Sequence, residues 1–279
     1  MSSYKEEHRR AVQLLVAAGV LEAELDAWYL LAHVTGMTRS AWYLRAEDEI
    51  PEEEAKQFLD LVEKRSTRMP LQYIIGSQEF MGLNFLVSPS TLIPRQDTEI
   101  LVEEAAKVSE GRKVLDLCTG TGCIIISLAK LCKLKHAVGT DISEEAVATA
   151  EKNAALLEAD VEFFCGDLFE ALKEGETFDV IVSNPPYIPT KVIEGLMPEV
   201  REFEPVTALD GAEDGLKFYR EIIGQAKQYL SPGGKLFFEI GCEQSEDVTG
   251  ILQAHAFSEI KVVKDYAGLN RVVCATWME

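Results

Sequence analysis

The run Asn184-Pro185-Pro186-Tyr187 contains the residue types that can hold a flat, electron-poor nitrogen. Two successive prolines donate no hydrogen bonds, and the residue before a proline is kept out of the helical region. We therefore expect the Asn184 side chain and the Pro185 carbonyl to face a site as two oxygen acceptors, which suit an NH₂ group with two donors. Tyr187 would add an aromatic wall, against which a flat substrate or a positive charge packs well.

The chemistry that suits this run is substitution at a planar NH₂ group. An amide or adenine nitrogen is a poor nucleophile because its lone pair is delocalised. Two accepted hydrogen bonds orient the group and favour a pyramidal nitrogen whose lone pair points at an electrophile. No strong general base is needed, since the proton leaves after the nitrogen has become cationic, and catalysis is mainly positioning and electrostatics. A rigid turn without a ligand is the alternative interpretation of this run.

A glycine-rich loop, Cys118-Thr119-Gly120-Thr121-Gly122, follows the apolar run that ends at Leu117. Its two glycines allow a tight turn and a close approach of the backbone to a ligand. A dinucleotide fingerprint needs glycine or alanine three positions after Gly122, where this sequence has Ile125, so the loop argues against NAD.

Two further turns come at the ends of apolar runs. Asp141 lies where an acid can accept both ribose hydroxyls of a nucleoside, although it could equally cap a turn before Ser143. Asp167 and Leu168 follow Gly166, where a side chain could meet adenine or form an ordinary turn.

The elements that must position these motifs form an alternating pattern. Strands are predicted at 114–117, 137–141, 161–165, 178–183 and 234–240, with 260–264 and 271–277 closing the chain. Helical patterns lie between them, which predicts an α/β fold with a parallel sheet and helices on both faces. Ligands of such sheets bind beyond the carboxyl ends of the strands, where every motif above lies.

The region before this pattern is different. Apolar residues at helical spacing predict a small helical bundle over residues 4–70. Short strands are expected at 73–75 and 79–85, around glycine turns. We therefore divide the chain into a helical bundle at 1–72, a β-hairpin linker at 73–92 and an α/β domain at 93–279.

The composition excludes several partners. The net charge of −20 repels phosphate backbones, so free nucleic acid is not expected as a partner. The six cysteines form no CxxC pair and lie mostly in apolar runs, which is typical of small buried side chains in a reducing compartment, and the four histidines show no metal-ligand spacing. The N-terminal residues lack the apolar core of a secretory signal, and there is no run of about 18 apolar residues to span a membrane. A cytoplasmic protein without a metal is expected.

Taken in order, the glycine-rich loop, Asp141 and Asn184-Pro185-Pro186-Tyr187 resemble a class I methyltransferase that acts on nitrogen. More specifically, the chain resembles the peptide chain release factor glutamine methyltransferases of the HemK type over nearly its whole length. The more specific segments of this resemblance are Glu79–Gly82, Pro94–Glu99, Ala208–Gly211, Asp214–Leu216 and Asp265–Arg271.

The resemblance implies a seven-stranded Rossmann-like sheet, a helical domain that grips the substrate, and methyl transfer from S-adenosylmethionine to the side-chain N5 of the glutamine in a Gly-Gly-Gln loop of class I release factors. It implies a monomer. The implied cofactor contacts are Cys118 to Gly122 with the methionine part, Asp141 with the ribose, and Asp167 and Leu168 near adenine. Asn184 would border both cofactor and substrate, and Asn184 to Tyr187 would bind the glutamine amide. The family often has glycine at the position of Cys118 and can have an aromatic residue at that of Leu168.

Several alternatives stay open on the sequence alone. A ribosomal-protein glutamine methyltransferase uses the same chemistry, and an adenine-N6 nucleic-acid methyltransferase holds a similar NH₂ group, although the charge argues against it. A silent binding protein with this fold would not need the Asn-Pro-Pro-Tyr run. Arg95 and Glu99 could form a surface ion pair at a helix start or lie close to the site.

Overall fold

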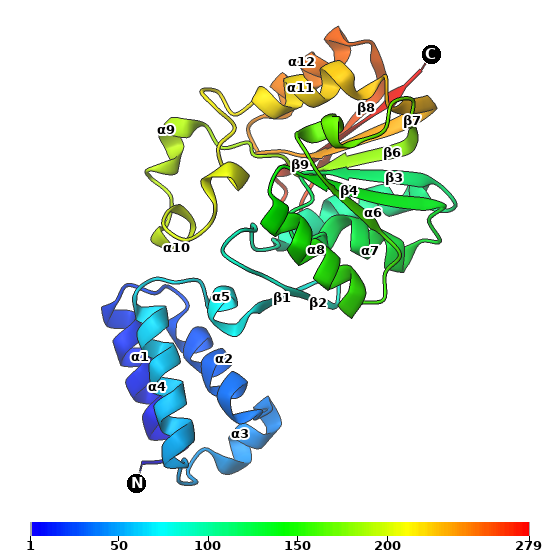
Figure 1. The fold of residues 1–279 in the computed structure, drawn as a ribbon. Coiled ribbons are helices and arrows are strands. Elements are labelled where there is room, and N and C mark those ends of the chain that lie inside the picture. The colour runs from blue at the N-terminus through cyan, green and yellow to red at the C-terminus, as the bar shows by residue number, and fades with distance from the viewer. Residues whose placement is uncertain (1, 279) are drawn as a thin grey trace. The chain divides into compact units, whose positions relative to one another are not determined.

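The computed structural model describes residues 2–278, which fall into two compact units (Figure 1). The first unit combines the chain up to Gly76 with a distant short segment, Met197–Phe203. The second unit combines Ser77–Leu196 with the chain from Glu204 onward.

The first unit is helical, as the apolar spacing predicts for residues 4–70. Its helices are α1 (Tyr4–Ala17), α2 (Ala23–Thr35), α3 (Arg39–Arg45), α4 (Glu52–Ser66), α5 (Leu71–Ile75) and, from the distant segment, α10 (Pro198–Arg201). A capping box between Ser3 and Glu6 starts α1, and three glutamates in the first turn favour the start of α4 after Pro51. Leu15, Leu31 and Phe58 belong to the buried core that these helices share.

The expected strand at 73–75 is wrong. These residues lie in α5, which ends at Gly76 in the left-handed conformation, with φ of 85°. The apolar run from Tyr73 to Ile75 is too short for its spacing to separate a helix from a strand.

The second unit begins with the predicted hairpin, formed by β1 (Ser77–Phe80) and β2 (Leu83–Leu86). Its two turn residues, Met81 and Gly82, both have positive φ, as the tightest hairpin turns require. Phe80 and Phe85 are buried and meet edge to face, so the hairpin is fixed to the unit's core.

A seven-stranded sheet follows, with strand order β5-β4-β3-β6-β7-β9-β8. Its strands are β3 (Lys113–Leu117), β4 (His136–Asp141), β5 (Glu162–Cys165), β6 (Phe178–Ser183), β7 (Leu230–Glu239), β8 (Phe257–Lys264) and β9 (Asn270–Trp277). The predicted α/β fold is confirmed. The expectation of a wholly parallel sheet is wrong for β9, which pairs antiparallel with both neighbours. A short turn joins β8 to β9, and parallel pairing of these strands would need a long crossover instead.

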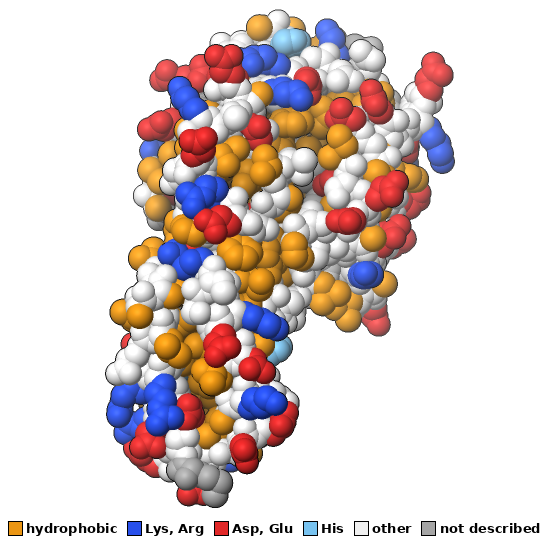
Figure 2. Space-filling model, turned by 60° about the vertical axis from the view of Figure 1, so that its left-hand side comes forward, with side chains coloured by type: hydrophobic (Ala, Val, Ile, Leu, Met, Phe, Trp, Pro, Cys, Tyr) orange, Lys and Arg blue, Asp and Glu red, His pale blue; other side chains and the backbone are white. Residues whose placement is uncertain are grey.

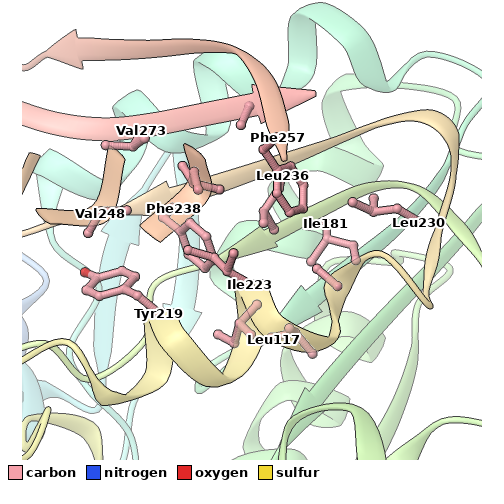
Figure 3. Packing of buried hydrophobic residues seen from close by; sticks show 14 of the residues in the cluster. Leu117, Ile181, Tyr219, Ile223, Leu230, Leu236, Phe238, Val248, Phe257 and Val273 are labelled. Carbon is pink, nitrogen blue, oxygen red and sulfur yellow. The ribbon is translucent and has the colours of Figure 1, made fainter. Parts of the chain in front are cut away.

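Helices cover both faces of the sheet (Figure 1). One face carries α6 (Glu99–Ser109), α7 (Cys123–Leu131) and α8 (Glu144–Leu156), and the other carries α11 (Lys217–Ala226) and α12 (Ser245–Ala254). Alternate strand residues belong to the two cores, so Val180 packs on the α6 side and Ile181 on the α11 side. Figure 3 shows the α11 side, where Tyr219 and Ile223 lie among strand residues such as Phe238.

Short elements complete the second unit at the loops. These are the 3₁₀ turns η1 (Gln96–Thr98), η2 (Leu168–Ala171) and η3 (Val206–Ala208), and the short helix α9 (Thr190–Ile193). None of the described helices is both long and apolar enough to cross a membrane.

The six cysteines are all free thiols. Cys123 and Cys132 are buried as expected, but Cys165 and Cys242 are exposed. Both exposed cysteines lie at or just after the carboxyl end of a strand, where the chain emerges from the sheet.

Candidate active site

The predicted motifs meet at a cavity of ≈ 330 Å³ at the carboxyl edge of the parallel strands. Its walls include most of the residues singled out above, namely Cys118, Thr119, Gly120, Thr121, Asp141, Asp167, Leu168, Asn184 and Pro186. Gly122, Pro185 and Tyr187 are not part of its lining. All of these residues belong to the second unit.

The glycine-rich loop turns through the left-handed region at three alternate residues. Cys118, Gly120 and Gly122 have φ of 59°, 55° and 78°. A cysteine at such a φ is strained, whereas glycine would adopt it freely. Gly122 is the N-cap of α7, and a Cβ added to it would come within 2.9 Å of the Ile126 side chain, so the loop lies tightly against α7.

Asp141 fixes this loop from the end of the neighbouring strand. One carboxylate oxygen accepts the Gly120 amide at 2.9 Å, and the other accepts the Ser143 amide at 3.0 Å. Burial raises the pKa of Asp141, and these backbone donors oppose the rise. Asp141 therefore caps the turn before α8 and also lines the cavity, which unites the two roles that its position allowed.

Asp116 lies beneath the same loop, fully buried. Thr119 donates its hydroxyl to one oxygen of Asp116 at 2.6 Å. Burial raises the pKa of Asp116 to about 7, against the opposing effect of this hydrogen bond.

Asn184 and Tyr187 each have a polar partner on another element. Asn184 donates from Nδ2 to the Thr98 hydroxyl at 3.4 Å. Tyr187 donates its hydroxyl to Glu239 Oε1 at 3.3 Å, and its backbone carbonyl accepts from Gln244 at 3.0 Å. The Tyr187 ring packs against the α11-side core, so the structure brings Asn184 and Pro186, rather than Tyr187, to the cavity wall.

A second loop, residues 208–216, lies directly on the backbone of the Asn-Pro-Pro-Tyr run. The amide of Ile188 donates to the Leu209 carbonyl at 3.0 Å, and Gly211 returns a bond to the Ile188 carbonyl at 2.8 Å. A Cβ added to Gly215 would come within 2.3 Å of the Tyr187 carbonyl, and one added to Gly211 within 2.8 Å of the Tyr187 Cα. Both glycines therefore permit a contact that holds the run in place.

Arg95 and Glu99 each bond a different partner, so the surface ion pair, one of the two interpretations left open by the sequence, is not formed. Arg95 lines the cavity and donates to both oxygens of the buried Glu204 at 2.7 Å. Glu99 accepts the Met81 amide at 2.7 Å and so fixes the hairpin turn to the start of α6. The partner of Arg95 is thus not Glu99, four residues along the chain, because folding brings Glu204 from a distant loop.

Arg271 links the turn between β8 and β9 to η1, the 3₁₀ turn that contains the Asn184 partner Thr98. Its guanidinium donates to Asp265 at 3.1 Å and reaches Asp97 at 3.0 Å. Asp97 precedes Thr98 in η1, so this pair places the partner of Asn184. The specific segments of the sequence resemblance therefore converge on the Asn-Pro-Pro-Tyr run.

Thr98 and Glu239 are among the residues around this site that the sequence analysis missed. Thr98 lies within Pro94–Glu99, where the ionic residues drew attention instead. Glu239 is an acid at the end of the buried strand β7, beside the strand that leads into Asn184. The signal that could have identified Glu239 is an acid at the carboxyl end of an apolar run, which is the signal that singled out Asp141.

Comparison with solved structures identifies the fold. A methyltransferase from Pyrococcus furiosus superposes with a TM-score of 0.55 and 19% identity, over 72% of this chain and 91% of that chain. The Rossmann-like class I methyltransferase fold predicted from the sequence is thus confirmed, and this protein is a methyltransferase of that class.

Comparison with known sequences gives the family. The family model for the PrmC N-terminal domain matches residues 8–76, and that for the methyltransferase small domain matches residues 95–197. The chain is 46% identical to the release factor glutamine methyltransferase of Geobacter sulfurreducens, over 93% of this chain and 91% of that protein. It is 41% identical to the one from Clostridium acetobutylicum, over 94% and 96%. The chain belongs to the release factor glutamine methyltransferase family.

Proposed function

We propose that this protein transfers a methyl group from S-adenosylmethionine to the side-chain N5 of the glutamine in the Gly-Gly-Gln loop of class I release factors. The N–C bond forms as the S–C bond breaks, the nitrogen becomes cationic, and its proton leaves to water. The observation that carries the proposal is the position of Asn184 and Pro186 on the wall of the cavity that Asp141 also lines. Family membership supports the substrate.

The residues around the cavity fit the cofactor. Each Asp141 oxygen accepts one backbone amide and keeps a second lone pair, which suits the two hydroxyls of a ribose. The loop from Cys118 to Gly122, of which all but Gly122 line the cavity, would surround the methionine part, while Asp167 and Leu168 would border adenine. The cavity volume lies in the usual range for small-molecule sites. When bound, the cofactor supplies a methyl group activated by a sulfonium.

The Asn-Pro-Pro-Tyr run would hold the target amide. Asn184, which lines the cavity, would accept one of its hydrogens through Oδ1, and the carbonyl of the neighbouring Pro185, which is not part of the lining, would accept the other. These two bonds would turn the nitrogen lone pair toward the methyl group. Because no proton has to be removed before attack, these residues need only orient the amide. We further propose that the protein acts as a monomer and does not bind free nucleic acid, given its charge of −20.

Methyl transfer can be tested directly with labelled S-adenosylmethionine. We expect the label to enter a class I release factor and to be absent from a version whose loop glutamine is replaced by alanine. A ribosomal protein and an adenine-containing duplex serve as parallel acceptors. Equal labelling of both release factor versions, or labelling of neither, contradicts the proposal, and labelling of a parallel acceptor instead identifies the alternative substrate.

The role of Asn184 makes a second prediction. Asn184→Ala should lower kcat by about 100-fold or more, because one of two orienting acceptors is lost. Its affinity for S-adenosylmethionine, measured by calorimetry, should stay within about threefold, since Asp141 and the glycine-rich loop are intact. Turnover close to that of the wild type would show that Asn184 does not orient the substrate.

A further inference from the structure

The side chain of Gln244 joins three backbone segments at the end of the Asn-Pro-Pro-Tyr run. Its Nε2 donates to the Tyr187 carbonyl at 3.0 Å and to the Gly215 carbonyl at 3.2 Å, while its Oε1 accepts the Gly241 amide at 2.9 Å. The reversed amide would place Oε1 against two carbonyls and the NH₂ group against an N–H, so these bonds fix its orientation. Gln244 is not part of the cavity lining.

The position of Gln244 is itself fixed by the turn that it closes. Gln244 is the N-cap of α12, and its backbone amide donates to the Gly241 carbonyl at 2.9 Å. A Cβ added to Gly241 would come within 2.9 Å of the Gln244 Oε1, and one added to Gly215 within 2.7 Å of its Nε2, so both glycines make room for the amide. The helix α12 packs on the sheet through the buried Val248 and Leu252, which gives the amide a firm base.

The peptide unit between Tyr187 and Ile188 is bonded on both of its edges. Gln244 donates to its carbonyl, and its N–H, which belongs to Ile188, donates to the Leu209 carbonyl at 3.0 Å. A peptide unit is planar, so two bonds on opposite edges prevent it from turning. The loop of residues 208–216 supplies one of these bonds and Gln244 supplies the other.

The two prolines carry this constraint back to Asn184. The strand β6 fixes the backbone as far as Ser183. Pro185 and Pro186 have no N–H to donate, but their rings fix φ at about −65°, so this part of the run is stiff. The chain is held again at the Tyr187–Ile188 peptide, and a stiff segment held at its two ends keeps Asn184 in one place.

We propose that Gln244 is a positioning residue for methyl transfer, which holds the Tyr187 carbonyl and thereby sets where Asn184 and the Pro185 carbonyl lie. Without its amide, the Tyr187–Ile188 peptide can turn, and the stiff run carries both acceptors away from the target NH₂ group. This inference rests on the proposed function for its kinetic consequence, but the anchoring of the peptide can be measured without any substrate.

The kinetic test compares Gln244→Leu with Gln244→Glu. Leucine makes none of the three bonds, so we expect kcat to fall about 10- to 100-fold, as a small misplacement of the reacting groups causes. KM for both substrates should stay within about threefold, because Gln244 does not line the cavity. At about pH 8 the glutamate variant has the same shape but an ionised carboxylate that only accepts hydrogen bonds, so it should lose at least as much. Wild-type kcat in either variant would overturn the inference.

Two controls separate positioning from a general loss of stability. Val248→Ala leaves a cavity under the same helix, and Gln225→Leu makes the same chemical change on α11, where the exposed Gln225 bonds the Glu221 carbonyl of its own helix. Val248→Ala should lower the melting temperature but keep kcat within about twofold, and Gln225→Leu should change neither. Calorimetry with the product S-adenosylhomocysteine should give the wild-type stoichiometry for Gln244→Leu, which shows that this variant is folded. An equal loss of kcat in Val248→Ala and Gln244→Leu would overturn the assignment to the amide.

Hydrogen exchange of the Ile188 amide, followed by nuclear magnetic resonance, tests the anchor without a release factor. In the wild type this N–H is bonded to the Leu209 carbonyl within a peptide unit that cannot turn, so it should exchange slowly. In Gln244→Leu its exchange should become about fivefold faster or more, since one edge of the unit is released, and in Gln225→Leu it should not change. Equal rates in the wild type and Gln244→Leu would reject the anchor. If the wild type methylates no release factor, the proposed function fails, and this measurement still decides whether Gln244 holds the peptide.

Discussion

At the scale of single residues, the carboxylate of Asp141 has two tasks. It holds the Gly120 and Ser143 amides, and it lines the cavity where a ribose would bind. A carboxylate can do both because each oxygen has two lone pairs. The amide of an asparagine in the same place cannot do both. Its NH₂ group accepts no hydrogen bond, so neither a backbone amide nor a hydroxyl could donate to it.

Asp141→Asn is therefore expected to weaken S-adenosylmethionine binding by about 10- to 100-fold, which corresponds to the loss of one hydrogen bond to a charged group. Asp179→Asn is a matched control, because Asp179 accepts the Lys113 amide at 2.9 Å but lies away from the cavity. Calorimetric titration of both variants would measure the difference. Equal affinities in the two variants would exclude a cofactor role for Asp141.

At the scale of elements, α10 is fixed within the first unit by charge. Glu199 accepts from Arg65 at 2.9 Å and from Arg68 at 2.7 Å, and Arg65 also donates to the buried Asp26 at 2.7 Å. Burial alone would raise the pKa of Glu199, but the hydrogen bonds from Arg68 and Arg65 outweigh it and lower the pKa to about 2. A helix of four residues has little stability of its own, so this ion pair holds it in place.

The depressed pKa gives a pH-dependent stability. Glu199 has an ordinary pKa of 4.5, so its contribution, about 3 kcal/mol, is complete above that pH and is lost as the pH falls toward 2. Glu199→Gln should lower the free energy of unfolding at pH 7, and the difference from the wild type should shrink below pH 4.5. Trp28 and Trp42 lie in the first unit and report its unfolding by fluorescence. Glu202→Gln, which removes an exposed partner of Arg201, should change little. A pH-independent difference for Glu199→Gln would contradict the assignment.

At the scale of the whole molecule, periodicity and motif order predicted the strands, the fold class and one part of the cavity wall. Strand ends could be assigned because each motif follows an apolar run, as Asp141 and Asn184 do. The pairings of Arg95 with Glu204 and of Thr98 with Asn184 could not, since they join loops far apart in the sequence. The antiparallel β9 was missed because an apolar run has the same pattern in either direction.

Charged side chains of both signs are distributed over the face that Figure 2 shows. On this face, acidic and basic side chains are interspersed with apolar ones, and neither sign forms a continuous block. With a net charge of −20, this arrangement favours solubility and gives that face no basic track for a phosphate backbone.

The return of residues 197–203 to the first unit means that the border between the units is not a single cut in the sequence. A gene fragment that stops at Gly76 encodes the helices but omits Glu199, the acid that neutralises Arg65 and Arg68. A chimaera that exchanges this unit between relatives must therefore transplant both pieces together, or leave Arg68 without its acidic partner and Arg65 with Asp26 alone.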